Sequence, residues 1–247
     1  MDISVVVTFH NENLLAHWML NMFARTRGHA ERHGLCVEVI CVLDSANEDT
    51  TRLVTNHDTL RATDTVIQVM NRDLATSRND GIQRAKGAYI AIVDGDDYYS
   101  EAWLTNARAR ARETLDKAVV HPEYVVSFGT VHSVTRVIDQ ERHPYPLASC
   151  LKIHPWISTA FAPTHIFREI PYRACDAQAG YGYEDWHWNL EVLSADYRHV
   201  TAPGTALYYR RKAVSMLTHY VQRGVTIRPT GFFRDPGKWA KWAKVSR

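Results

Sequence analysis

Three carboxylates directly follow an apolar run near the middle of the sequence. Residues 89–93 (YIAIV) have the length and β-branched content of a buried strand, and Asp94, Asp96 and Asp97 come next. In open α/β sheets, ligands bind beyond the carboxyl ends of such strands. Neighbouring anions repel by roughly 1 kcal/mol per pair, so a cation is expected here, and oxygen ligands suit Mg²⁺ or Mn²⁺. The pattern also fits a polar turn, because Asp and Gly are common turn formers.

A second pair of acids, Glu184 and Asp185, follows the glycine-containing segment 180–182 and begins a predicted helix over 184–195. An attacking hydroxyl must lose its proton, and a nearby carboxylate can accept it. The position equally suits a structural acid, because acids stabilise the first turn of a helix through its macrodipole. The residues alone leave both interpretations open.

Strands and helices alternate through the first half of the sequence and place the first group of acids at a strand end. Apolar runs predict four strands, and helical periodicity with capping residues predicts the helices between them. The predicted strands are 3–9, 36–43, 65–69 and 89–93, and the predicted helices are 14–26, 48–55, 75–85 and 101–115. This series predicts a parallel sheet. Beyond residue 118 we expect short strand-like pieces, an irregular stretch and one clear helix, 184–195.

The composition fits one globular domain of 247 residues, 45% hydrophobic and 23% charged, without a linker rich in Pro, Ser or Gly. The net charge of +2 gives no reason to expect a nucleic-acid partner. Four cysteines without CxxC spacing indicate a reducing, cytoplasmic location. With no signal peptide and no apolar run of ~18 residues, we predict a soluble protein or, at most, one peripheral to the inner face of the membrane.

Four segments occur in the order and approximate spacing of the motifs of family 2 glycosyltransferases with the GT-A fold. They are VVVTFHNE, VICVLDSANEDTT, LATSRNDGIQRAKGAYIAIVDGDDYY and GYGYEDWHWNLEVL, and they cover about the first 200 residues. The chain resembles this family, which implies an α/β fold with a Rossmann-like, mostly parallel sheet flanked by helices and an acceptor-side second half. The implied enzyme moves a sugar from a UDP-, GDP- or dTDP-linked donor to a glycan or lipid-linked saccharide acceptor in polysaccharide or cell-surface glycan synthesis. The family usually needs Mn²⁺ or Mg²⁺ and usually inverts the anomeric centre.

The resemblance assigns residues of the first two strand ends to the nucleoside. Thr8, Phe9 and Glu12 lie in the loop after the first strand, and Asp44 follows the second. Thr8 stands where the family commonly has Pro. Asp44 also fits an Asx turn or a cap for the helix 48–55.

Arg78 and Asn79 resemble the family's pair beside the nucleotide, and a guanidinium offers a planar donor fork that suits phosphate. The resemblance assigns Asp94 mainly to the ribose side, with a share in the metal site, and Asp96 to the metal that bridges the diphosphate. Gly95 is expected to leave room for the ligand.

Asp97 either supports the metal shell or caps the next helix, a role for which Ser100 competes.

In the second half, the resemblance makes Asp185 the base and gives Glu184 a role in binding or orienting the acceptor. Arg211 or Lys212, in the late basic run YYRRK, is expected to hold the departing diphosphate, although an edge-strand charge run also explains the pattern. His154 matches no diagnostic motif and is interpreted as structural.

We expect a single domain over 1–230, with a nucleotide-binding half (1–117) and an acceptor and catalytic half (118–230), followed by a basic aromatic tail (231–247). Trp239 and Trp242 in the tail, with a lysine every third residue, suit an anionic membrane surface. They equally suit packing on the domain, or an exit helix to a further module of a longer protein.

Two other functions fit parts of the sequence. A sugar nucleotidyltransferase also uses an α/β sheet and carboxylate-bound Mg²⁺, but it requires a basic, glycine-rich first loop, which TFHNEN is not. A catalytically silent carbohydrate-binding or scaffold domain does not need both acidic motifs, and this chain has both.

Overall fold

Four parallel strands form one half of the central sheet in the computed structural model, which describes residues 1–143, 145–213 and 215–237. Their order across the sheet is β3 (Thr65–Val69), β2 (Val37–Asp44), β1 (Ile3–Phe9) and β4 (Tyr89–Asp94). Every residue of β1 and β2 is buried, because helices cover both faces of the sheet. The four predicted strands are therefore confirmed to within one residue at their ends.

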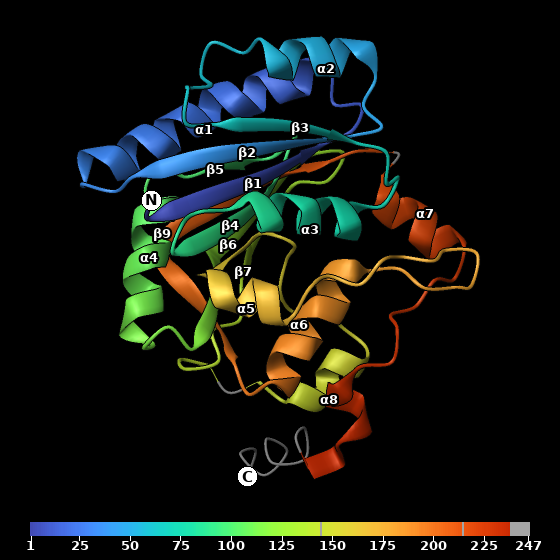
Figure 1. Cartoon of the computed structure of the whole chain (residues 1–247). Coiled ribbons are helices and arrows are strands. Elements are labelled where there is room, and N and C mark those ends of the chain that lie inside the picture. The colour runs from blue at the N-terminus through green and yellow to red at the C-terminus, as the bar shows by residue number, and fades with distance from the viewer. Residues whose placement is uncertain (144, 214, 238–247) are drawn as a thin grey trace.

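The alternation of side chains along β1 separates two cores, one on each face of the sheet. Val5 and Val7 pack in the cluster that includes α1 (Leu14–Arg32) and α4 (Trp103–Glu113). Val6 packs in the opposite cluster, with residues of α3 (Leu74–Arg84), α5 (Thr164–Glu169) and α6 (Glu184–Ser194). Figure 1 shows α1 and α3 on opposite sides of the sheet.

The second half of the chain extends the same sheet rather than forming another. Its strands are β8 (Ala160–Pro163), β6 (Ala118–Gly129), β9 (Arg198–Arg211) and β7 (Ser133–Arg136), and the short strand β5 (Tyr98–Tyr99) of the first half joins them in the sheet. β8 is antiparallel to β4, whereas β6 and β9 run parallel to each other. β9 also pairs with β5, with Tyr98 opposite Tyr208, and this pairing holds the basic end of β9 beside the acidic turn after β4.

Two expectations for the second half are wrong. β6 is one strand of 12 residues rather than short pieces, and a register shift at Pro122 to Tyr124 interrupts its pattern. The described residues after 118 also contain more than one α-helix. Besides α6 they hold α5, α7 (Met216–Gln222) and α8 (Gly231–Arg234), of six, seven and four residues, which are too short to show a helical period. Two further helical segments are α2 (Glu48–Thr55) and a 3-10 turn at Leu147–Leu151.

The packed part of the chain continues beyond the boundary expected at residue 230. Phe232 in α8 is buried, and the Gly231 amide donates to the Glu191 side chain on α6 over 2.9 Å. The predicted features of the tail, Trp239 and Trp242, lie outside the described residues. Within the parts of the chain that the structure describes, none of the helices is both long and apolar enough to cross a bilayer.

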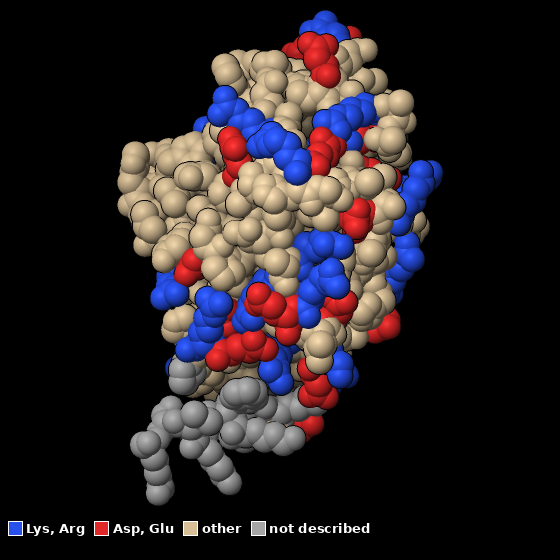
Figure 2. Space-filling view, turned by 90° about the vertical axis from the view of Figure 1, so that its left-hand side faces the viewer, with Lys and Arg blue, Asp and Glu red and all other residues tan. Residues whose placement is uncertain are grey.

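Charged side chains of both signs are interspersed on the face shown in Figure 2, where Lys and Arg do not merge into one basic surface. Proteins that bind nucleic acid usually carry such a surface as the footprint of phosphate contacts. This face does not have that footprint.

Candidate active site

Gly95 is required by its contact with the end of β1. A Cβ at this position would lie 2.4 Å from Cδ1 of Phe9 and 2.7 Å from the carbonyl oxygen of Thr8. The Phe9 ring is itself only 1% exposed. The close approach at Gly95 is therefore to the chain's own first strand, and the room that it is expected to leave for a ligand stays a prediction. Phe9 has only its backbone to offer a nucleoside.

Asp94 at the end of β4 has a partner on each carboxylate oxygen. Its Oδ1 accepts from Nη2 of Arg78 over 2.8 Å, and its Oδ2 accepts from Oγ of Ser158 over 2.7 Å. Arg78 is fully buried, and its Nη1 donates to Oε1 of Glu184 over 3.0 Å. One guanidinium thus joins an acid of the first half of the chain to an acid of the second half.

Burial and charge together set the protonation of this group. Burial disfavours the charged form of Arg78, but Asp94 and Glu184 outweigh it and raise the pKa of the guanidinium, which stays charged. Burial, and then the charge of Asp185, raise the pKa of Glu184 to about 7, although Arg78 opposes the shift. Burial also raises the pKa of Asp185, again against Arg78.

Asp185 is the more accessible acid of the pair. Its side chain is 23% exposed, whereas that of Glu184 is 5% exposed. Its Oδ1 accepts from the Trp186 amide over 2.8 Å, and its Oδ2 lies 3.7 Å from Nδ1 of His154. Glu184 is engaged by Arg78 and approached by the Cys175 thiol at 3.6 Å. The geometry therefore separates an open carboxylate from an anchored one.

His154 faces Asp185 as a neutral imidazole. The Asn189 amide donates to Nε2 of His154 over 2.8 Å, which places the ring proton on Nδ1, the nitrogen nearest Asp185. Burial lowers the pKa of His154 to about 3, so the ring carries no charge near neutral pH. The ring also stacks on Trp186, with centroids 5.8 Å apart. These contacts fix the orientation of a donor toward the carboxylate.

Asp96 and Asp97 have different environments despite being neighbours. Oδ2 of Asp96 forms an ion pair with Nζ of Lys212, just beyond the end of β9. Asp97 is 1% exposed; its Oδ1 accepts from the Arg210 amide over 2.8 Å, and its Oδ2 has no hydrogen-bond partner among the described residues. Burial, followed by the charges of Asp96 and Asp94, raises the pKa of Asp97 well above its ordinary value.

The helix cap expected from Asp97 or Ser100 is wrong. Helix α4 begins after Ala102, with no side-chain cap, and the Ser100 hydroxyl instead accepts a hydrogen bond from the Ala206 amide over 3.0 Å.

Glu12 lies near the same acids. Burial raises the pKa of Glu12, the charge of Asp96 raises it further, and the charge of Lys212 lowers it. Glu12 is therefore close enough to Asp96 and Lys212 for their charges to act on it. Thr8, on the neighbouring strand end, is opposite Asp94 in the β1–β4 register.

The remaining donor-side residues make contacts within the chain. Asp44 is buried and accepts from the amides of Arg72 and Asp73, over 2.8 and 3.0 Å, and from the Ser77 hydroxyl over 2.9 Å. It thereby holds the loop between β3 and α3. The side chain of Asn47, rather than that of Asp44, caps α2, so the cap role considered for Asp44 is wrong.

Asn79 holds the backbone of Tyr172 through both the nitrogen and the oxygen of its side-chain amide. Its Nδ2 donates to the Tyr172 carbonyl over 2.8 Å, and its Oδ1 accepts from the Tyr172 amide over 3.0 Å. The Tyr172 ring in turn lies 5.4 Å from the guanidinium carbon of Arg78. In this arrangement Asn79 acts on the site through the position of Tyr172.

Residues 4–168 match the sequence profile described as Glycosyl transferase family 2. The chain belongs to this family. A curated relative, the protein named "Uncharacterized glycosyltransferase EpsJ" from Bacillus subtilis, is 34% identical over 77 residues, which are 31% of this chain and 22% of that protein. The predicted family is thus confirmed.

Solved structures show the same fold for this family 2 member. Residues 1–349 of TarS from S. aureus, solved with UDP-GlcNAc, superpose with a TM-score of 0.64 at 18% identity, over 95% of this chain and 64% of TarS 1–349. The mannosyltransferase PcManGT from Pyrobaculum calidifontis, solved with GDP-Man and Mn²⁺, gives 0.61 at 16% identity, over 90% and 60% of the two chains. The chain therefore spans less than two thirds of each of these relatives, and the predicted GT-A fold is confirmed.

The acids of this family 2 site suit a metal that is shared with a diphosphate. Among the described residues, no group of three or more His, Cys, Asp or Glu side chains is arranged to hold a metal by itself. Mg²⁺ and Mn²⁺ need only one or two carboxylates when substrate phosphates supply further oxygens. Asp96 fits best, because a single cationic side chain occupies it and the unpartnered Oδ2 of Asp97 belongs to the same turn. Both oxygens of Asp94 already have partners, so Asp94 fits less well.

Arg210 is a site residue that the sequence offered beside Arg211 and Lys212 but that was not favoured. Its side chain donates to the Asp96 carbonyl over 3.2 Å and to the Tyr98 hydroxyl over 2.6 Å, and it therefore supports the acidic turn from behind. Arg211 instead lies over the Tyr209 ring at 5.3 Å. Strand alternation separates Arg210 from Arg211, but it does not say which of them faces the acids.

Ser158, His154 and Asn189 were missed as site residues. Ser158 donates to Asp94, His154 faces Asp185, and Asn189 contacts His154; all three are placed by tertiary packing, and their residue types and spacing carry no motif.

Proposed function

We propose that this chain is a metal-dependent glycosyltransferase that moves a sugar from a nucleoside diphosphate sugar to a hydroxyl acceptor with inversion. The observation that carries the proposal is the Arg78 bridge, which holds Asp94 of the donor side and Glu184 beside the accessible carboxylate of Asp185. TarS was solved with UDP-GlcNAc and PcManGT with GDP-Man and Mn²⁺, which supports a nucleotide-sugar donor here.

The donor lies along the carboxyl ends of β1, β2 and β4. Thr8, the Phe9 backbone and Glu12 frame the nucleoside, and Asp44 supports this region through the loop it holds. Asp94 contacts the ribose and stays oriented by Arg78.

Asp96 would hold Mn²⁺ or Mg²⁺ at this site, and Asp97 in the same turn is the second candidate ligand. When bound, the metal neutralises the charge that develops on the departing diphosphate, and it stabilises the transition state more than the ground state. Lys212 gives up its ion pair with Asp96 and binds the phosphates, where its ammonium group stabilises the negative charge of the departing diphosphate. Arg211, the preceding residue, contributes a second cation.

Asp185 is the base of the transfer. The acceptor oxygen bonds to the anomeric carbon, its proton passes to a carboxylate oxygen of Asp185, and the bonding pair of the breaking C–O bond leaves with the diphosphate. The Trp186 amide holds the carboxylate in place, with Nδ1 of His154 facing it at 3.7 Å, while Glu184 stays anchored to Arg78. One base and one displacement give inversion.

The acceptor is a glycan or a lipid-linked saccharide, because the approach to Asp185 is lined by rings on which sugar faces can pack. Trp186 contacts Tyr183 edge to face at 6.0 Å, beside the stacked His154. Such a reaction belongs in the cytoplasm, in polysaccharide or cell-surface glycan synthesis, where nucleotide sugars are the donors.

Binding of a donor to the intact chain tests this function. A panel of UDP-, GDP- and dTDP-sugars is titrated by calorimetry with and without Mn²⁺, and one of them is expected to bind only with the metal. Asp96→Ala should remove the metal-dependent binding of the donor. The melting temperature should not fall, because the substitution relieves repulsion among the acids. Asp58→Ala, at an exposed acid remote from the site in sequence, is the matched control. If no nucleotide sugar binds, or if Asp96→Ala binds it as the parent does, the proposal fails.

A further inference from the structure

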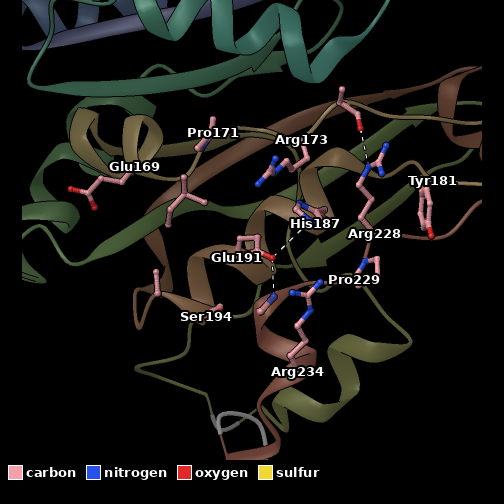
Figure 3. A pocket seen from close by; sticks show the side chains of 14 residues that line it. Glu169, Pro171, Arg173, Tyr181, His187, Glu191, Ser194, Arg228, Pro229 and Arg234 are labelled. Atoms are coloured by element: carbon pink, nitrogen blue, oxygen red, sulfur yellow. Dashed lines mark hydrogen bonds and ion pairs between the residues drawn. The ribbon is translucent and has the colours of Figure 1, made fainter.

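A polar pocket of about 770 Å³ lies beside α6, among residues to which the proposed transfer gives no role (Figure 3). Its wall combines residues of α6 with the segment after α5 and the segment around the start of α8. The lining residues used below are Arg173, His187, Glu191, Arg228 and Arg234, together with Glu169. Pockets of this size hold sugar-sized or nucleotide-sized ligands.

Three arginines in the pocket have no carboxylate partner. Among the described residues, the side chains of Arg173 and Arg234 form no hydrogen bond or ion pair. Arg228 donates from Nε to the Ala174 carbonyl over 3.2 Å and lies over the Tyr181 ring, 4.8 Å from its centroid, which leaves its two Nη groups without a partner in the same part of the chain. These guanidinium groups offer paired donors in the geometry that phosphate accepts.

The two acids of the pocket are already engaged by neutral donors. Oε2 of Glu169 accepts from the Tyr197 hydroxyl over 3.2 Å, and Oε1 of Glu191 accepts from the Gly231 amide over 2.9 Å. With three arginines against two glutamates, the lining keeps an excess of positive charge. A ligand that enters this space therefore meets unpaired cations rather than unpaired anions.

His187 is a buried polar group without a complete set of partners at the centre of this arrangement. It is 5% exposed, its Nδ1 has no hydrogen-bond partner among the described residues, and its Nε2 faces Oε1 of Glu191 at 3.8 Å. In Figure 3 the side chains of Arg173 and Arg234 lie above and below it. Burial lowers the pKa of His187, and Arg173 and Arg228 add to this effect against Glu191, so both arginines are close enough to act on the ring.

We propose that this pocket binds a phosphate-bearing small molecule, with the phosphate held by Arg173, Arg228 and Arg234 in front of His187. The site is separate from the donor site, because none of its residues lies among the acids after β4 or at the end of β9. His187 follows Glu184 by three residues on one face of α6, a rise of about 4.5 Å along the helix axis. The bound molecule therefore lies one helical turn from the anchored acid of the active site.

Thermal shift and calorimetry with the whole chain test the proposal. The probes are inorganic phosphate and sn-glycerol 3-phosphate in the presence of EDTA, which prevents metal-dependent binding at the donor site, with sodium chloride at matched ionic strength as the reference. We compare the parent with Arg173→Ala/Arg234→Ala and with Arg25→Ala/Arg84→Ala, a control pair of exposed arginines that removes the same charge. The parent and control should be stabilised equally by phosphate, and the pocket variant should bind at least about tenfold more weakly.

The outcomes separate a built site from a general charge effect. Stronger binding of the ester than of the free ion identifies a phosphate ester as the ligand class, whereas equal binding identifies the phosphate group alone, and both support the site. Equal loss in the pocket and control variants overturns it, as does the absence of any response of the parent beyond that to chloride. The ¹⁵N imidazole resonances of His187 should move with phosphate in the parent but not in the pocket variant, which tests the location independently of stability.

Discussion

Nη1 of Arg78 lies 3.0 Å from Oε1 of Glu184, although the two residues are 106 positions apart in the chain. The contact is buried on both sides, with side-chain exposures of 1% and 5%. Because the same guanidinium holds Asp94, the acid of the donor side and the helix that carries the candidate base are fixed relative to each other.

The first prediction concerns this bridge. Arg78→Met keeps the length of the side chain but leaves Asp94 and Glu184 without their shared cation, so the free energy of unfolding should fall by about 3–5 kcal/mol. Urea unfolding at pH 7.5 measures the loss. Arg84→Met, at an exposed arginine of the same helix, is the control and should change stability by no more than about 0.5 kcal/mol. Similar losses in the two variants would show that the bridge contributes no more than a surface arginine.

The second prediction is a pH dependence that originates in Glu184, whose pKa rises from 4.5 to about 7 through burial and the charge of Asp185. Between these values the folded protein holds a proton that the unfolded chain has released. Its contribution to stability is therefore complete below about pH 4.5 and is lost as pH rises through about 7, a total of about 3 kcal/mol.

Glu184→Gln should remove this slope. Unfolding free energies at closely spaced pH values from 5 to 8 would compare the parent, the variant and Glu48→Gln, a control at an exposed acid. Parallel curves for the parent and Glu184→Gln would exclude Glu184 as the source.

The third prediction separates a base from a structural acid at Asp185. Asp185→Asn retains the shape and the acceptor oxygen for the Trp186 amide but cannot take a proton, so transfer should fall by about 10²-fold or more while donor binding and melting temperature stay near the parent values. The measurement is turnover at saturating donor and acceptor. An ordinary first-turn acid would give the reverse: a stability loss of at most ~1 kcal/mol and nearly parental turnover. That result would leave Glu184 as the next candidate.

The fourth prediction concerns Lys212, which competes with a metal for Asp96. Lys212→Met removes the ammonium group, so Mn²⁺ alone should bind up to about fivefold more tightly, the limit set by a partly exposed ion pair. Donor binding with Mn²⁺ should weaken, because the same ammonium group is then missing from the phosphates. Electron paramagnetic resonance of free Mn²⁺ measures the first effect and calorimetry the second, with Lys86→Met as the exposed control. Unchanged Mn²⁺ affinity would show that Lys212 does not compete with the metal for Asp96.

The parallel half of the fold could be predicted because its strands are covered on both faces and two of its helices, α2 and α3, carry recognisable caps. β1 and β3 have the predicted bounds, and Asn47 and Asp73 cap the helices that follow β2 and β3. α1 continues to Arg32, six residues beyond its predicted end at Thr26, because Thr26 and Arg27 are buried despite their polarity. A buried arginine paired with Asp64 does not show in a hydrophobic pattern.

The site was harder to predict wherever a side chain acts through a distant partner. The carboxylates of Asp94 and Asp96 follow a strand and are visible in the sequence, but the contacts of Ser158 and Lys212 with them depend on how β8 and β9 join the sheet. The role of His154 likewise depends on Asn189, which selects the nitrogen that carries its proton.

The position of β9 between β6 and β5 has a consequence for biosynthesis. Tyr98 and Tyr99 obtain their strand partners only when residues 207 and 208 have been made, and β4 obtains its outer neighbour only with residues 160–163. During translation, the strand that follows the acidic turn therefore stays unpaired until more than 100 further residues have been made. Such long-range strand pairing forms slowly, and the unpaired strand edges are meanwhile exposed to other chains. We expect a fragment ending at residue 117 to aggregate rather than to act as a nucleotide-binding module.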